Sequence, residues 1–210
     1  MANPFENLRA KAGDGQKSIW WYMRNAQKLV GASLSPNTAM QSDIGELKSN
    51  IEIGSMYMYY YDPKWKNELP FYDAFPLVLP FGPAPGGFYG INLHYAPYLV
   101  RGKILGELLK FADSKTFTPT TKIRMSYQML QSISTANEVK PCIKHYLTTH
   151  VQSRFMKINP IDWKSAIFLP LEAFQKKTKE EVLMEKREKK AEEKASQRAY
   201  FAFQNLIDAK

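Results

Sequence analysis

The spacing of hydrophobic residues changes twice along the chain. From residue 19 onward, apolar side chains recur every three to four positions, which predicts an amphipathic helix that Ser18 caps and Gly31 ends. Residues 51–61 are bulky on both alternating faces, which predicts a strand with little solvent exposure. Helical spacing returns at Pro97. We therefore expect a central β region with helices before and after it in the sequence.

Two further strands are predicted after the first. Phe75–Phe81 contains two prolines, which favour an edge or bulged strand. A turn rich in glycine and proline, residues 82–87, separates it from a third strand, Phe88–Leu93. The pattern predicts an α+β protein built on a small twisted β-sheet or an SH3-like barrel, with antiparallel pairing of the second and third strands.

The remaining segments are predicted mainly as helices and connectors. Residues 32–50 mix Ser, Pro, Asn and Gly, which is typical of a connector. The later elements expected are helices at 97–111, from Thr118 through Ile133, from Pro141 through Leu147 and at 162–169, and a short strand within 151–158. In the first of these helices we expect Leu99, Ile104, Leu105, Leu108 and Leu109 to face inward.

The C-terminal part changes composition to Lys and Glu from Gln175 onward, without an apolar heptad, which indicates a long charged helix exposed to solvent. We divide the chain into an N-terminal helical arm and connector (1–48), an α+β core domain (49–172) and a charged C-terminal helical extension (173–210). Aromatic residues at both ends, on helices joined to the core by polar segments, are expected to contact neighbouring chains. These partner-binding candidates are Trp20, Trp21, Tyr200, Phe203 and Ile207.

The net charge of the chain indicates what kind of partner it binds. The 210 residues have a formal net charge of +9, which favours a polyanionic partner such as nucleic acid or an acidic protein surface. The single cysteine excludes an internal disulfide and fits a reducing compartment, or a virion assembled in one. No apolar run approaches the roughly 20 residues that span a bilayer, and the first residues do not resemble a signal peptide, so we expect no membrane partner.

The sequence contains no recognised motif for a metal site, a phosphate-binding loop or a catalytic nucleophile. Cys142, His145 and His150 lie close in sequence, with His94 as a possible fourth ligand, but they lack the paired spacing of a zinc site. The glycine clusters at 13–15 and 86–87 match no phosphate-binding fingerprint, and no serine lies in a nucleophile elbow. We therefore expect no metal, no cofactor and no catalytic residues, and a protein that acts by binding.

Basic residues with interleaved aromatics remain as the candidate site, because cations contact phosphates and aromatic rings stack on exposed bases. Lys64, Trp65 and Lys66 form a predicted loop. Core packing of the aromatics and a solvated surface for the cations are the alternatives. The DNA-binding candidates are Arg101, Lys103, Lys122, Arg124, Lys140 and Lys144.

Three passages together resemble structural proteins of tailed phages. They are residues 54–64 (GSMYMYYYDPK), 69–78 (LPFYDAFPLV) and 87–95 (GFYGINLHY). Most nearly they resemble the DNA end protector family of T-even-type phages, a likeness that residues 140–147 and 163–170 strengthen. The resemblance implies a virion protein of head completion, assembled in the host cytoplasm, that sits on the ends of packaged DNA and shields them from exonuclease.

Two hypotheses follow from the residues and the resemblance. In the first, the protein is a virion component that binds packaged double-stranded DNA or its ends without sequence preference. In the second, it is a structural connector of the neck, tail or baseplate that binds other phage structural proteins. The salt dependence of DNA affinity distinguishes them, because phosphate contacts release counterions.

Overall fold

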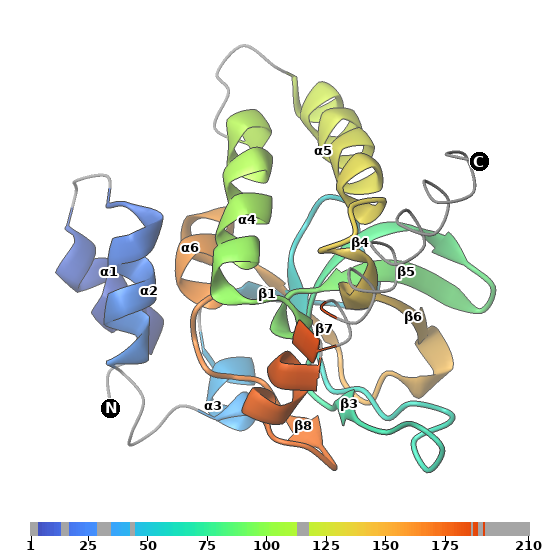
Figure 1. Ribbon diagram of the computed structural model, residues 1–210. Helices are drawn as coiled ribbons and strands as arrows, with labels where there is room; N and C mark the ends of the chain where they lie inside the picture. Colours follow the sequence, from blue (N-terminus) through green and yellow to red (C-terminus); the bar gives the residue numbers. More distant parts are fainter. Residues whose placement is uncertain are drawn as a thin grey trace, which may run out of the picture.

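A six-stranded antiparallel sheet forms the centre of the computed structural model, which describes residues 4–13, 17–28, 35–42, 45–112, 118–185, 187–188 and 191 (Figure 1). Across the sheet the order is β1 (Gly45–Lys48), β7 (Phe155–Ile158), β2 (Tyr57–Met58), β4 (Leu77–Ala84), β5 (Gly87–Asn92) and β6 (Ile143–Leu147). A second, two-stranded sheet pairs β3 (Tyr72–Asp73) with β8 (Phe174–Gln175). The α+β class is therefore confirmed.

The β4–β5 hairpin confirms the predicted antiparallel pairing of the second and third strands. Its register runs from Val78 opposite Asn92 to Ala84 opposite Gly87, with an irregularity between Pro80 and Gly82. The expected bulge is present. The alternative of an edge position is wrong, because β4 lies between β2 and β5.

The sheet is open, so of the two predicted alternatives, a small sheet and an SH3-like barrel, the barrel is wrong. Its two outer strands, β1 and β6, come from segments predicted as a connector and as a helix. After the 3₁₀ turn η2 (Lys140–Cys142), β6 pairs along β5 instead of forming the helix expected from Pro141. Of the strand expected over residues 51–61, only β2 and an isolated bridge between Tyr61 and Val151 pair as strand.

Helices cover one side of the sheet. They are α1 (Pro4–Ala12), α2 (Ile19–Gln27), α3 (Pro36–Met40), α4 (Tyr98–Ala112), α5 (Pro119–Ser134) and α6 (Trp163–Ala166), with the 3₁₀ turns η1 (Leu93–Tyr95), η3 (Thr148–His150) and η4 (Pro160–Asp162). The predicted cap of α2 is confirmed, because Ser18 accepts a hydrogen bond from Trp21 N. The predicted start of α5 at Thr118 is also confirmed, and Thr118 caps the helix by accepting a hydrogen bond from Thr121 N. Figure 1 shows α4 and α5 side by side above the sheet.

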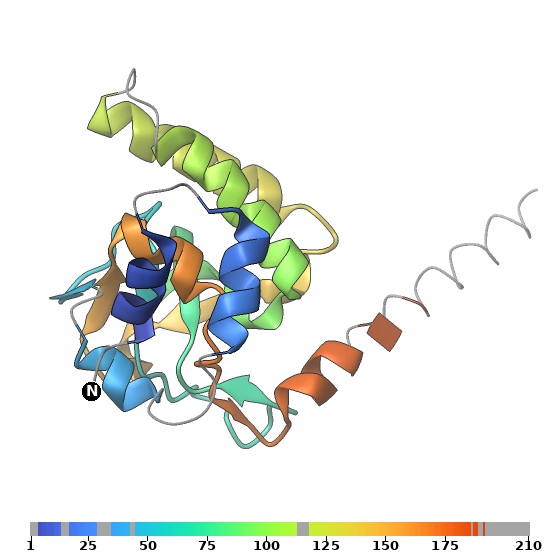
Figure 2. The same ribbon diagram turned by 90° about the vertical axis from the view of Figure 1, so that its left-hand side faces the viewer.

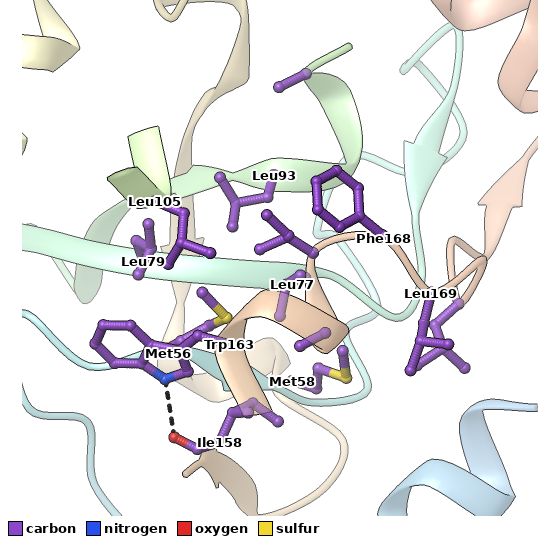
Figure 3. Packing of buried hydrophobic residues seen from close by; sticks show 14 of the residues in the cluster. Met56, Met58, Leu77, Leu79, Leu93, Leu105, Ile158, Trp163, Phe168 and Leu169 are labelled. Carbon is purple, nitrogen blue, oxygen red and sulfur yellow. Dashed lines mark hydrogen bonds between the residues drawn. The ribbon is translucent and has the colours of Figure 1, made fainter. Parts of the chain in front are cut away.

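The core lies between the sheet and the helices (Figure 3). Met56, directly before β2, is fully buried there, as are Met58, Leu77 and Leu79 of the sheet. Trp163 of α6 packs among them, and its Nε1 donates a hydrogen bond of 3.0 Å to the carbonyl of Ile158. The opposite face of the sheet buries a second, aromatic-rich cluster. Its buried members are Tyr57, Tyr59, Tyr61, Val78, Phe88, Tyr146 and Phe155. Two cores explain why residues 51–61 are bulky on both faces.

The N-terminal helices pack against the core rather than extending from it. Phe5 and Leu8 of α1 are fully buried in the same cluster as the sheet residues. Arg9 forms an ion pair with the buried carboxylate of Asp162 beside α6. Figure 2 shows α1 and α2 lying against α6 and α4. The expectation that α2 reaches beyond the core is therefore wrong. The domain boundaries at residues 48 and 172 stay predictions.

The C-terminal extension is described only in its first turns. Residues 179–185 are helical, and Val182 is fully buried in the main core. The rest of the predicted long charged helix lies almost entirely outside the described residues.

A glycine at the β5–β6 junction gives the first prediction. A Cβ on Gly87 would lie 1.8 Å from the carbonyl oxygen of Tyr146, so Gly87→Ala should force β5 and β6 apart. We expect the free energy of unfolding to fall by roughly 1–3 kcal/mol in urea titration. Gly82→Ala is the control, since a Cβ there meets nothing within 4 Å. Equal stability of the two variants would contradict the prediction.

Candidate nucleic-acid interface

Three of the predicted DNA-binding cations are exposed on the helical side of the molecule. Lys103 lies on α4, Arg124 on α5 and Lys140 on η2. None of them forms an ion pair with another residue that the structure describes. The sequence of α5 contains no acidic residue, so it adds no repulsion towards a phosphate backbone. Lys122 also lies in α5, but its side chain is outside the described structure.

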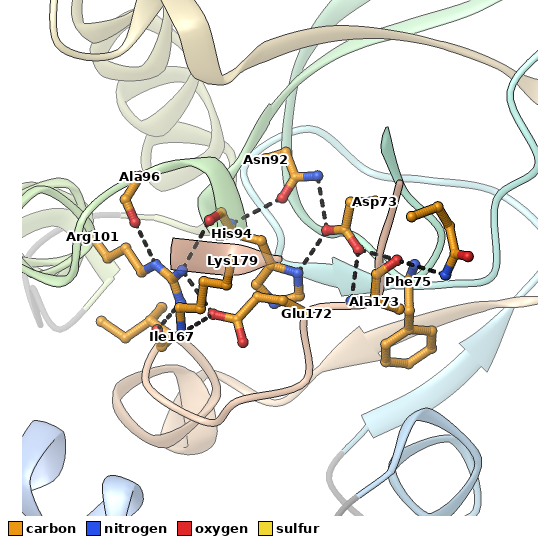
Figure 4. A network of polar contacts seen from close by, with 11 residues as sticks. Asp73, Phe75, Asn92, His94, Ala96, Arg101, Ile167, Glu172, Ala173 and Lys179 are labelled. Atoms are coloured by element: carbon orange, nitrogen blue, oxygen red, sulfur yellow. Dashed lines mark hydrogen bonds and ion pairs between the residues drawn. The ribbon is translucent and has the colours of Figure 1, made fainter. Parts of the chain in front are cut away.

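Arg101 is the exception, and its prediction as a DNA contact is wrong. The side chain has no exposed surface. Its guanidinium donates hydrogen bonds to the carbonyls of Ala96 (2.8 Å), Ile167 (2.9 Å) and His94 (3.0 Å), and to Oε1 of Glu172 (2.9 Å) (Figure 4). With these donors engaged inside the protein, Arg101 stabilises the fold.

The same network contains a second buried charge, the carboxylate of Asp73. It accepts hydrogen bonds from Nδ1 of His94 (2.7 Å) and Nδ2 of Asn92 (3.2 Å), as well as from two backbone amides (Figure 4). Asn92 Oδ1 in turn accepts from the amide of His94 at 2.9 Å. Because a buried carboxylate needs several donors, this arrangement fixes β3, β5 and the segment before β8 relative to one another.

Glu172 connects this network to the C-terminal helix. Its Oε1 lies 2.6 Å from Nζ of Lys179, which also donates to the hydroxyl of Tyr98. Burial opposes ionisation, but electrostatic attraction to His94, Arg101 and Lys179 outweighs it and lowers the pKa of Glu172 to about 2. The first turn of the C-terminal helix is therefore held to α4 by charge.

Lys144 is only half-buried and lies on β6 rather than on a helix. Its Nζ lies 4.2 Å from the ring centroid of Tyr95. Burial lowers the pKa of Lys144 from its usual value. A lysine held over an aromatic ring in this way is a weaker candidate for a phosphate contact than the exposed cations of α4, α5 and η2.

The partner-binding candidates divide between surface and core. The side chain of Trp20 is 57% exposed, whereas Trp21 packs against the core and contacts Tyr22 edge-on. Leu99, expected to face inward, is also 57% exposed. Both exposed residues border an apolar groove of about 620 Å³ between α2 and α4. Tyr200, Phe203 and Ile207 lie outside the described residues.

The histidines and the cysteine do not gather into a site. Cys142 and His94 are buried, while His145 and His150 donate hydrogen bonds of 2.9 Å to the carbonyls of Pro85 and Asp62. Within the described ranges, no group of three or more His, Cys, Asp or Glu residues is placed to hold a metal ion. None of the described helices is both long and apolar enough to cross a membrane.

Comparison with known proteins decides the family. The family described as phage T4 terminal DNA protecting protein matches residues 35–188 of the chain. The chain belongs to this family. The resemblance inferred from the sequence is therefore confirmed. No curated protein and no solved structure matches the chain.

The region shared with the terminal DNA protecting family includes every candidate DNA-binding cation. It excludes α1, α2 and the C-terminal partner-binding candidates Tyr200, Phe203 and Ile207. It also includes two features that the candidate site residues omitted. The contacts between Asp73 and His94 and between Arg101 and Glu172 carried no sequence signal, because the paired residues are far apart in the chain. The exposed ring of Trp65 did carry a sequence signal, because a lysine stands on each side of it in the sequence.

The depressed pKa of Glu172 predicts a defined loss of stability in acid. Because the folded-state pKa of about 2 lies below the ordinary value of 4.5, ionised Glu172 stabilises the fold fully above about pH 4.5. This contribution should disappear as the pH falls towards 2. We expect Glu172→Gln to flatten the dependence of unfolding free energy on pH between these values. An unchanged slope in urea titrations of the variant would contradict this role.

Proposed function

We propose that the chain is a phage virion protein that binds the ends of linear double-stranded DNA and shields them from exonucleases. Membership of the terminal DNA protecting family over residues 35–188 is the observation that carries the proposal. The net charge of +9 and the exposed cations Lys103, Arg124 and Lys140 support it, because they suit a phosphate backbone. In this proposal the protein acts by steric shielding, without catalysing a reaction.

The binding mode proposed is non-specific. The exposed cations on α4, α5 and η2 would contact phosphates and leave the base edges unread. Non-specific binding of this kind has dissociation constants of about 10⁻⁴ to 10⁻⁶ M at physiological salt and weakens steeply as salt rises. The protein would prefer the free ends of a duplex to its interior, whatever the base sequence.

Two DNA substrates of one sequence test the proposal. The purified protein is mixed either with linear duplex and an exonuclease, or with closed circular duplex and an endonuclease. We expect the linear DNA to be protected and the circle to be cut at nearly the rate without protein. Affinity for both should fall as salt rises.

The second candidate function is a connector that binds other phage structural proteins. Exposure of Trp20 and Leu99 beside the apolar groove favours it, because aromatic and aliphatic side chains are typical of interface centres. Absence of DNA binding at low salt, with normal incorporation into particles, would support the connector and overturn end protection.

A further inference from the structure

Residues 62–70 form a loop between β2 and β3 that presents a tryptophan to solvent. The side chain of Trp65 is 57% exposed. Nζ of Lys64 lies 4.9 Å from the centroid of its ring, and the other neighbour, Lys66, is also exposed. A large aromatic ring exposed between two cations departs from the usual burial of tryptophan and indicates a binding surface.

The loop is held in one conformation by its own backbone. The amides of Glu68 and Leu69 both donate 3.0 Å hydrogen bonds to the carbonyl of Trp65, and the amide of Lys66 donates to Pro63 at 3.1 Å. Nζ of Lys66 forms a 2.8 Å ion pair with Asp62. The ring of Trp65 is thus presented on a short, internally bonded turn.

A third lysine, from the segment after β8, fixes the loop to the rest of the molecule. Nζ of Lys176 donates to the carbonyls of Lys66 (2.7 Å), Asn67 (3.0 Å) and Leu69 (2.7 Å). Lys176 has a φ of 70°, the one positive value at a non-glycine residue in the described chain. Since L-residues adopt this conformation at a cost of roughly 1–2 kcal/mol, the fold tolerates local strain to hold the loop. Such prior ordering lowers the entropy lost when a ligand binds.

The chemistry of the loop fits the end of a DNA duplex. Along the duplex the bases are stacked and only their edges are accessible, but the terminal base pair exposes a flat aromatic face with phosphates at its rim. An indole ring stacks on any base, and lysines beside it reach phosphates. Resting on the end-binding function proposed above, we propose that Trp65 stacks on the terminal base pair of linear duplex DNA. Its neighbours Lys64 and Lys66 face the nearest phosphates, and Lys176 holds the loop in place.

The loop and the helical cations lie in different parts of the molecule. Figures 1 and 2 show the β3 end, which the loop adjoins, below the sheet and α4 and α5 above it. Trp65 would therefore select the end while the cations of α4, α5 and η2 add affinity along the backbone. Because the two surfaces share no residue, substitutions in one should leave the effect of the other intact.

The test compares an open blunt-ended duplex with the same duplex closed at both ends by hairpin loops, so that only the free ends differ. Wild-type protein should prefer the open duplex. Trp65→Ala should reduce affinity for it by about 5-fold to 150-fold, the range expected for one stacked base, and leave affinity for the closed duplex unchanged. Trp65→Phe should retain part of the preference.

Trp20→Ala is the matched control, because its ring is also 57% exposed but lies on α2 beside the groove. It should keep the full preference for open ends. If Trp65→Ala also keeps it, the inference is wrong. If that variant keeps end preference but fails to enter particles, Trp65 contacts a protein and the inference is again wrong. Wild-type protein that binds both duplexes equally, or neither, overturns the proposed function itself.

Discussion

Replacing Arg101 with methionine should lower the free energy of unfolding by about 3–5 kcal/mol. The substitution removes four hydrogen bonds and leaves the carboxylate of Glu172, which is 4% exposed, with Lys179 as its remaining ion-pair partner. Three carbonyls, those of Ala96, Ile167 and His94, lose a donor at the same time. Removing one partner of a buried pair costs more than the pair itself contributes, because the other charge stays desolvated.

Urea titration followed by circular dichroism measures this effect. Lys103→Met is the matched control, since it removes a cation of the same helix from an exposed position and should change stability by less than about 0.5 kcal/mol. The double variant Arg101→Met with Glu172→Gln should recover part of the loss, because the buried carboxylate that lost its Arg101 partner is then neutral. DNA affinity of the folded Arg101→Met fraction should match that of wild type. Equal stability of the Arg101 and Lys103 variants would refute the structural role.

The contrast between Arg101 and Lys103 shows which features of the candidate site can be predicted from the sequence and which cannot. Both are cations of one predicted helix, and both were candidates for DNA contact. Arg101 is three and four residues before Ile104 and Leu105, so it shares their apolar face, whereas Lys103 lies off it. The helical phase was therefore a usable signal. The partners of Arg101 were not predictable, because Ile167 and Glu172 come from segments 66 and 71 residues away.

The fold divides in the same way between local and distant determinants. The β4–β5 hairpin, the cap of α2 and the start of α5 depend on neighbouring residues, and the sequence predicted them. The strand β6 was predicted as a helix because Pro141 suits a helix start, but pairing with β5 decided its conformation. The open sheet was not predictable either, since its edges β1 and β6 are nearly a hundred residues apart in sequence.

Replacing Lys103, Arg124 and Lys140 together with alanine should weaken DNA binding strongly at every sequence. If each contacts one phosphate, the slope of log affinity against log salt falls by about 0.9 for each, or about 2.7 in all. At roughly 0.1 M salt, this loss of counterion release should lower the affinity on the order of a few hundred-fold. Stability should change little, because all three side chains are exposed. Fluorescence anisotropy with labelled duplex over a salt series gives both quantities.

A second triple variant separates a local interface from bulk charge. Lys11, Arg24 and Lys28 are also exposed, but they lie on or directly after α1 and α2, outside the region shared with the terminal DNA protecting family. Their replacement with alanine lowers the net charge by the same amount. Long-range attraction alone would make the two triple variants equally weak. If the DNA contacts lie on α4, α5 and η2, only the first triple variant should show a smaller slope of log affinity against log salt. Equal slopes for the two triple variants would place the DNA contacts elsewhere on the molecule.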